Sequence, residues 1–434
     1  MYVSIIGICM LVVFTLLIIS KKVSVLTALI GVPVLFGFIA GFGMETFTYA
    51  MDGVLGVSST FVLLTFAILY FSIMLCAGLF DPLSNVVIRF MGGDPLKVVV
   101  GTAILATLVS LDGDGTTTVM ICATALLPVY MKLKINTVYL AIFITMPNGV
   151  INLLPWGGPT ARLMSVLDVD SGELLGKLVP FMVIGILAII VMAYFVGIKE
   201  RKRLGTAAAS KAAEVGGGVE VPEEEKIFRR PKLIWFNFIL TIVVLVAVIA
   251  GWVSGPIAFG IGVCLALLVN YRDSKIQKKI IEYSASGILN VVLIIIGAGF
   301  LMGVLNQSGM AEQISSMIIS AIPESLGSAI NVIIAIISGP ILWILNNDAF
   351  YFGILPVFAE MASSYGFNDL QIALASLVGQ ALRGTSPVVP ALYLTAQYTH
   401  TDVGEFQKKA FPFTIVLLAA YFLAAFLLGA LTIA

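Results

Sequence analysis

Long apolar runs follow one another along this chain of 434 residues, and they constrain its fold more than any other feature. A helix needs about 20 apolar residues to cross the hydrocarbon core of a bilayer. Runs of this kind lie near residues 1–20, 23–42, 57–80, 138–155, 178–198, 233–253, 256–271, 286–305, 370–395 and 411–433. Inside lipid every backbone polar group must find a partner within the protein, and helices provide those partners. The sequence therefore predicts an all-α polytopic membrane protein.

The composition excludes most other classes of protein. Hydrophobic residues make up 60% of the chain and charged residues only 11%, whereas soluble domains carry about 25% charged residues. The formal net charge is zero, so the sequence lacks the basic excess typical of nucleic-acid binding. We therefore expect the lipid bilayer of the inner or plasma membrane as the environment and no nucleic-acid partner. We also expect no permanently bound cofactor.

Two further apolar regions, residues 96–131 and 326–363, are each interrupted in the middle. The first break reads DGDG at 112–115, and the second reads NND at 346–348. Each arm has about 15 residues, which is too few to cross the bilayer alone. Irregular backbone at membrane depth has to be buried in protein or line a water-filled cavity. We therefore expect two re-entrant helical hairpins.

Basic residues predict the orientation of the chain, because cytoplasmic loops carry an excess of Lys and Arg. The longest polar stretch, 199–232, is basic at both ends and is placed in the cytoplasm. With both hairpins re-entrant, the other basic loops fall on the same side. The acidic loops around Asp52, Asp168 and Asp170 fall on the opposite side. Both termini are then predicted outside.

The two halves of the chain resemble each other. DSGELLGKLVPF in the first half and DVGEFQKKAFPF in the second share the frame D-x-G-E-x3-K-x2-P-F. A distance of 31 residues separates Pro128 from Pro159, and the same distance separates Pro356 from Pro387. Each half holds five spans and one hairpin, and an odd number of spans inserts the second half upside down. Inverted repeats with discontinuous helices are typical of secondary transporters.

These features predict three parts of the chain. The first repeat occupies residues 1–198 and contains the hairpin 96–131. A small-residue, Gly-rich linker follows at 199–232 in the cytoplasm. The second, inverted repeat occupies 233–434 and contains the hairpin 326–363.

Ionisable side chains inside the apolar segments mark the candidate site. A charge at the bilayer centre costs at least about 2.5–3.5 kcal/mol, so such residues pair with one another or face water. The residues concerned are Asp112, Asp114, Arg162, Asp348, Glu360 and Arg383. Most of them lie at a hairpin tip or in the motifs WGGPTAR and LRGTSP, where helix ends leave backbone groups free. Glu360 lies near the outer end of a hairpin arm and is expected at the membrane interface.

The two arginines beside helix breaks predict an anionic ligand. A guanidinium group binds a carboxylate through two hydrogen bonds, and helix N-termini add positive partial charge. The aspartates suit a coupling cation, a proton or a divalent metal carried with the anion, because hard cations take oxygen ligands. A second interpretation stays open, in which Asp112 and Asp348 form salt bridges with Arg162 or Arg383 and hold the hairpins together.

Four motifs carry a resemblance to a known family: LDGDG, NLLPWGGPTAR, NNDAFYFGILPV and GQALRGTSPVVP. Together they resemble the CitMHS family of citrate–metal:proton symporters, within the ion transporter superfamily. The resemblance implies an elevator-type inverted repeat in which a transport domain moves against a scaffold. It also implies symport of citrate, or a similar di- or tricarboxylate, as a complex with Mg or Ca. Protons, or Na, would be the coupling ion.

The resemblance, carried onto this chain, implies the candidate substrate-binding residues. They are Asp112, Gly113, Asp114, Thr116, Thr117, Asn148, Gly158, Pro159, Thr160, Arg162, Asn346, Asn347, Asp348, Arg383, Gly384, Thr385, Ser386 and Pro387. Asp112, Asp114 and Asp348 are the candidate ligands of the carried metal.

Two other functions would need different residues from those of a citrate symporter. A cation/proton antiporter of the same superfamily fold is the alternative, and there the aspartates alone would act. An intramembrane enzyme is not expected, because the sequence offers few further carboxylates or histidines to complete a metal pair. A homodimer is expected by analogy with other elevator carriers.

Overall fold

The computed structural model describes residues 2–20, 22–79, 81–82, 86, 90–112, 115–204, 226–319, 327, 329–387 and 389–432. Within these ranges all regular elements are helices, which confirms the predicted all-α class. Among the described helices, five are long and apolar enough to cross a membrane alone: α4, α10, α12 with its preceding turn, α14 and α21. The other apolar helices of the described residues are shorter, with 10–17 residues.

The helices of the first half run in the order α1 (Tyr2–Ser20), α2 (Val25–Ile39), α3 (Glu45–Gly56), α4 (Ser58–Ala77), α6 (Pro95–Val109), η1 (Ser110–Asp112), α7 (Gly115–Leu133), α8 (Thr137–Ile151), α9 (Gly158–Met164) and α10 (Ser171–Leu204). Local sequence explains several boundaries. Asp94 caps α6 by accepting a hydrogen bond from Leu96 N at 3.1 Å, and Pro95 occupies the first turn, where no partner for an N–H is needed. Gly78 ends α4 in a left-handed conformation with φ of 87°.

The second half runs in the order η3 (Pro231–Leu233), α12 (Ile234–Ile249), α13 (Gly255–Asn270), α14 (Ser274–Gln307), α15 (Met310–Ile319), α17 (Ile330–Ile344), η4 (Ala349–Ile354), α18 (Leu355–Ser364), α19 (Asp369–Leu377), η5 (Val378–Thr385), α20 (Pro390–Tyr398) and α21 (Val403–Leu427). The order of long and interrupted helices parallels that of the first half. One difference is that α14 is a single helix of 34 residues where the first half has the separate helices α3 and α4.

Both predicted breaks are present, and two further interruptions lie beside them. In the first pair α6 ends at Val109 and α7 begins at Gly115, and in the second pair α17 ends at Ile344 and η4 begins at Ala349. The apolar run 138–155 continues as α8 and then turns into the short helix α9. The run 370–395, counted as one span, is in fact divided into α19, η5 and α20. Proline explains the break between η5 and α20, because Pro387 and Pro390 lack the N–H that a continuous helix would need.

The helices pack in two groups. In the first, α14 packs against α2, α3 and α4, and α13 packs against α4. Glycines allow the close approach of α3 and α14, since a Cβ on Gly53 would stand 2.0 Å from Gly299 O and one on Gly303 would stand 2.1 Å from Tyr49 O. In the second group, α6, α8 and α10 pack on one another and meet η5 and α21 of the other half. We call these the α14 group and the hairpin group.

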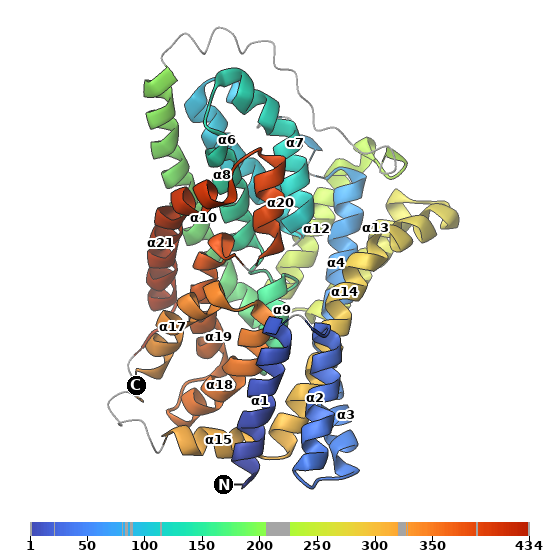
Figure 1. Ribbon diagram of the computed structural model, residues 1–434. Helices are drawn as coiled ribbons and strands as arrows, with labels where there is room; N and C mark the ends of the chain where they lie inside the picture. The colour runs from blue at the N-terminus through green and yellow to red at the C-terminus, as the bar shows by residue number, and fades with distance from the viewer. Residues whose placement is uncertain are drawn as a thin grey trace.

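The two hairpin pairs occupy opposite ends of the molecule. Figure 1 shows α6 and α7 in the upper part and α17 and α18 in the lower part, with α9 between them. Both chain ends are marked at the lower end, whereas α10 reaches the upper end. The two pairs thus come from opposite ends of the molecule, with α9 between them (Figure 1).

Candidate functional site

An ion pair between the two halves lies at the centre of the candidate site. Arg162 of α9 donates from Nε to Asp348 Oδ1 at 2.5 Å, across a sequence separation of 186 residues. The two side chains are only 15% and 11% exposed. Arg162 Nη1 also donates to Gly158 O at 2.8 Å, which fixes the guanidinium group against its own helix. The salt bridge between Asp348 and Arg162, left open by the sequence, is therefore present.

The WGGPT motif places α9 in this position by a tight turn. A Cβ on Gly157 would stand 1.9 Å from Asn152 O, so only glycine fits there. Asn152 Oδ1 accepts a hydrogen bond from Gly158 N at 3.0 Å, and the Thr160 hydroxyl donates to Leu153 O at 2.6 Å. Thr160 is fully buried. The Thr160 hydroxyl thus donates its hydrogen bond within the turn and does not donate to a ligand in this state.

A polar cluster lies at the tip of the first hairpin. Asn148 of α8 donates from Nδ2 to Ser110 Oγ at 3.3 Å and to Thr118 Oγ1 at 3.4 Å. Gly115 allows this approach, because a Cβ there would stand 3.1 Å from Asn148 Oδ1. Trp156 donates from Nε1 to Leu111 O at 3.2 Å and stacks on Phe71. Trp156 therefore supports the tip by packing.

Part of the predicted site lies outside the described residues. This applies to Gly113 and Asp114, and to the side chains of Asp112, Thr116 and Thr117. Among the described residues no three His, Cys, Asp or Glu side chains gather as a metal site. Of the three candidate metal ligands, the structure describes the side chain of Asp348 alone.

The second hairpin tip is held by amide side chains. Asn346 Oδ1 accepts a hydrogen bond from Ala349 N at 2.8 Å at the start of η4. Asn347 Oδ1 accepts one from Gln380 Nε2 of η5 at 3.1 Å. Gln380 Nε2 lies 3.0 Å from the buried Tyr351 hydroxyl as well. The NND break is thereby bound to the interrupted helix beside it.

Arg383 of η5 holds the same tip from the other side. Its Nη1 donates to Leu342 O at 2.9 Å and to Leu345 O at 2.7 Å, at the C-terminal end of α17. Helix C-termini carry free carbonyls and negative partial charge, so a guanidinium group is stabilised there. The Nε and Nη2 groups of Arg383 bond to no described atom, and they remain able to donate to a carboxylate.

The GTSP segment after Arg383 is structural in this state. Thr385 donates to Leu382 O at 2.9 Å, and Ser386 donates to Trp343 O at 2.6 Å. Gly384 lies against α8, since a Cβ there would stand 3.3 Å from Thr145 Cγ2. Pro387 is exposed. The hydroxyl protons predicted to bind substrate are thus engaged with backbone carbonyls.

Sequence reasoning missed several polar groups around the breaks. Ser110, Thr118, Tyr351 and Gln380 all take part in the hydrogen bonds above. The indole N–H of Trp343 is buried without a hydrogen-bond partner among the described residues. One of these residues could have been found from the sequence, because Gln380 is a polar residue within an apolar run and lies shortly before the motif LRGTSP. Glu360 is exposed on α18.

A cavity of about 530 Å³ leads toward α9 from the α14 group. One wall is formed by α3, α4 and α14 and includes Thr60 and Asn306. The other wall is formed by the end of α9 and the segment that follows it, from Met164 to Ser171. Arg162 does not line this cavity, so in this state the ion pair is closed off from it. The cavity lies between the α14 group and the segment that joins α9 to α10.

Comparisons with known proteins show the family of this chain. Residues 3–379 match the CitMHS family model, described as citrate transporter. A Bacillus subtilis (strain 168) protein named citrate transporter is 41% identical over 426 residues, which cover 98% of this chain and 99% of that protein. A second protein of the same organism, named Mg(2+)/citrate complex secondary transporter, is 39% identical over 431 residues, with 99% of each chain covered.

A solved structure shares the fold. It is that of the YdaH transporter of Alcanivorax borkumensis, with 13% sequence identity and a TM-score of 0.58. The match covers 88% of this chain and 87% of the other. The family and these relatives are transporters, so the prediction that the chain is not an enzyme is confirmed, as is the resemblance drawn from the four motifs. By the match of its family model and by its relatives, the chain belongs to the CitMHS family of citrate transporters.

Proposed function

We propose that this protein is a secondary transporter that carries citrate as a complex with a divalent cation, in symport with protons or another cation. The family supports citrate as the substrate, and the relative named a Mg(2+)/citrate complex transporter supports the divalent cation. The proposed binding region lies where α9, η4, η5 and the first hairpin tip meet.

The ion pair between Arg162 and Asp348 is the observation that carries this proposal. It holds a cation and an anion next to each other, and the two charges come from opposite halves of the chain. A trivalent citrate bound to a divalent cation offers the complementary pair, because its carboxylates suit a guanidinium group and its metal suits a carboxylate oxygen. Bare citrate would match Arg162 and be repelled by Asp348.

Binding would then exchange partners without leaving a buried charge uncompensated. In the ligand-free state Asp348 satisfies Arg162 Nε. When the complex enters, a citrate carboxylate takes over Arg162, and Asp348 turns to the metal. The two unbonded donors of Arg383 lie on η5 beside the same hairpin tip and provide a second carboxylate contact. An exchange of this kind avoids the cost of breaking a buried pair.

The arrangement of the helices supports an alternating-access mechanism. We propose that residues 1–198 and 233–434 are inverted repeats, that 199–232 is the cytoplasmic linker, and that the hairpins 96–131 and 326–363 enter from opposite faces. The hairpin group would move against the α14 group, with both termini outside and a homodimer as the assembly. The cavity between the α14 group and the segment that joins α9 to α10 lies where such movement would open a path.

Uptake of radiolabelled citrate into proteoliposomes tests the proposal. We expect uptake that requires Mg²⁺ or Ca²⁺ and increases with an inward proton gradient. Uptake of citrate with chelator present would contradict transport of a metal complex. Cation-driven proton flux without citrate, unaffected by loss of Arg162, would instead establish the antiporter.

A further inference from the structure

A basic groove lies on the outer surface of the α14 group, away from the proposed substrate site. Its volume is about 800 Å³, and it is formed by residues 229–233, the end of α13 and the start of α14. Four of its lining residues are cationic, and Asp273 is the one acidic residue among them. The cationic residues are Arg229, Arg230, Lys232 and Arg272.

Two of these cations hold the groove together. Arg229 Nη1 pairs with Asp81 at 2.9 Å, just beyond the C-terminal end of α4. Arg230 donates from Nε to Asn270 O at 2.7 Å, and its guanidinium group lies 4.6 Å from the centre of the Tyr271 ring. These contacts fix the segment before α12 against α4 and α13. They also compensate the free carbonyls at the end of α13.

The other two cations are available to a ligand. Lys232 and Arg272 are exposed and form no ion pair with any described residue. Asp273 is occupied as the N-cap of α14, where Oδ1 accepts a hydrogen bond from Lys275 N at 2.9 Å. Among the described residues, the positive charge of Lys232 and Arg272 is thus uncompensated, and it lies at the N-terminal end of a 34-residue helix, which adds to the attraction for an anion.

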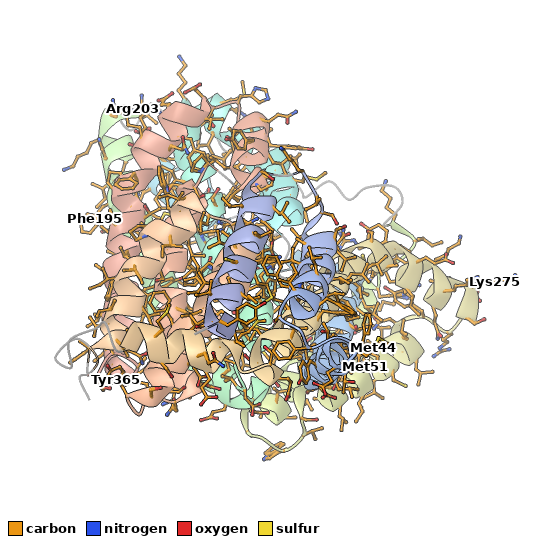
Figure 2. All side chains as sticks on the ribbon, turned by 60° about the horizontal axis from the view of Figure 1, so that its bottom comes forward. Met44, Met51, Phe195, Arg203, Lys275 and Tyr365 are labelled. Atoms are coloured by element: carbon orange, nitrogen blue, oxygen red, sulfur yellow. The ribbon has the colours of Figure 1, made fainter. Side chains whose placement is uncertain are left out.

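An apolar stripe on α13 leads directly out of the groove. Ile257, Ile261, Leu265 and Leu268 are all exposed, and their spacing places them on one face of the helix. Leu268 also lines the groove. Figure 2 shows Lys275 at the edge of the molecule, where the first turns of α14 project from the bundle. A cationic pocket that continues into an apolar helix face matches an amphiphile better than a free anion.

We infer that this groove binds the headgroup of an anionic phospholipid, with an acyl chain lying along the stripe Ile257–Leu268 of α13. Basic pockets between helices at the cytoplasmic side of a membrane bind such headgroups. A free phosphate would satisfy the charges but not the apolar stripe. A zwitterionic lipid would fit the stripe but would bring its own positive charge into the groove.

Native mass spectrometry of the full chain in neutral detergent tests this inference. Dioleoyl phosphatidylglycerol and dioleoyl phosphatidylcholine are added at equal concentrations, and the retained lipid is counted. We expect selective retention of phosphatidylglycerol, weakened by about fivefold for each groove charge removed, as in the double variant Lys232→Gln with Arg272→Gln. The matched control Lys278→Gln with Lys279→Gln removes the same amount of charge from the first turns of α14, outside the groove, and we expect it to bind lipid nearly as well as the unaltered chain.

Three results would overturn the inference. Equal retention of the two lipids by the unaltered chain would show that the groove does not select an anionic headgroup. Equal weakening in the groove and control variants would assign the effect to diffuse surface charge. Displacement of the lipid by glycerol 3-phosphate at comparable concentration would make the groove a phosphate site. The unaltered chain decides the first and third points even where a variant fails to fold.

Discussion

Replacing Asp348 by asparagine removes one partner of the ion pair that joins the two halves. The change keeps the size of the side chain, so its main effect is electrostatic. Arg162 then keeps its charge, 15% exposed, with Gly158 O as its remaining partner. We therefore expect the variant to lose both stability and transport.

The magnitude follows from the burial of the pair. Removal of one partner from a fully buried salt bridge costs about 3–5 kcal/mol. Because both side chains of this pair retain some exposure, 15% and 11%, we expect about 2–3 kcal/mol for Asp348→Asn. Arg162→Gln should cost a similar amount. The double variant leaves no isolated charge, so its cost should be smaller than the sum of the two single costs by about 1 kcal/mol or more.

Transport is expected to respond differently from stability. The double variant should recover stability relative to the sum of the single variants and still lack citrate uptake, because both proposed ligand contacts are absent. Unfolding in mixed detergent micelles measures the first quantity, and proteoliposome uptake with Mg²⁺ measures the second. Insertion and monodispersity of each variant serve as controls.

Two results would refute this reasoning. Strictly additive stability losses would show that the two side chains do not act as a pair. Uptake by Asp348→Asn at the rate of the unaltered protein would show that this carboxylate does not bind the carried metal. In that case the pair would be structural only.

Three further predictions concern neighbouring features. Arg383→Ala should abolish citrate uptake while the protein still inserts into the membrane normally. Arg383→Lys should also take up little citrate, because an ammonium group cannot bind the end of α17 and a substrate carboxylate in two directions at once. Normal uptake by either variant would exclude Arg383 from the site. Gly157→Ala should cost about 1–3 kcal/mol and displace α9, because a Cβ would stand 1.9 Å from Asn152 O. Gly149→Ala in α8, which meets nothing within 4 Å, is the control in the same uptake and unfolding assays, and equal behaviour of the two variants would disprove the tight turn. Burial raises the pKa of Asp369 above its ordinary value, although Asp168 N donates a hydrogen bond to it at 3.0 Å. Because the carboxyl pKa of Asp369 is raised in the folded state, the protein gains stability as the pH falls through that pKa. Asp369→Asn should therefore raise the Tm at pH 7 and leave it nearly unchanged in acid, where Asp369 is protonated. An equal rise in Tm at both pH values would contradict the raised pKa.

Much of the fold could be predicted from local features of the sequence. Apolar run lengths indicated a helical membrane protein. The breaks at DGDG and NND indicated two interrupted helix pairs, because clustered Asp, Asn and Gly residues are unfavourable inside an apolar helix. The length of α14 and the division of 370–395 were less predictable. Helix continuity there depends on whether neighbouring helices and side chains can satisfy the backbone groups freed by glycine and proline.

The sequence by itself determined the class of the protein, the positions of two of its helix breaks and the family to which it belongs. The tertiary structure alone decided that Arg162 pairs with Asp348, that Arg383 holds the end of α17, and that the hydroxyl groups of Thr385 and Ser386 donate to backbone carbonyls. The physical reason is that these interactions act only over short distances. A hydrogen bond or ion pair forms only between atoms about 3 Å apart, and which atoms come that close depends on how the two halves of the chain pack against each other.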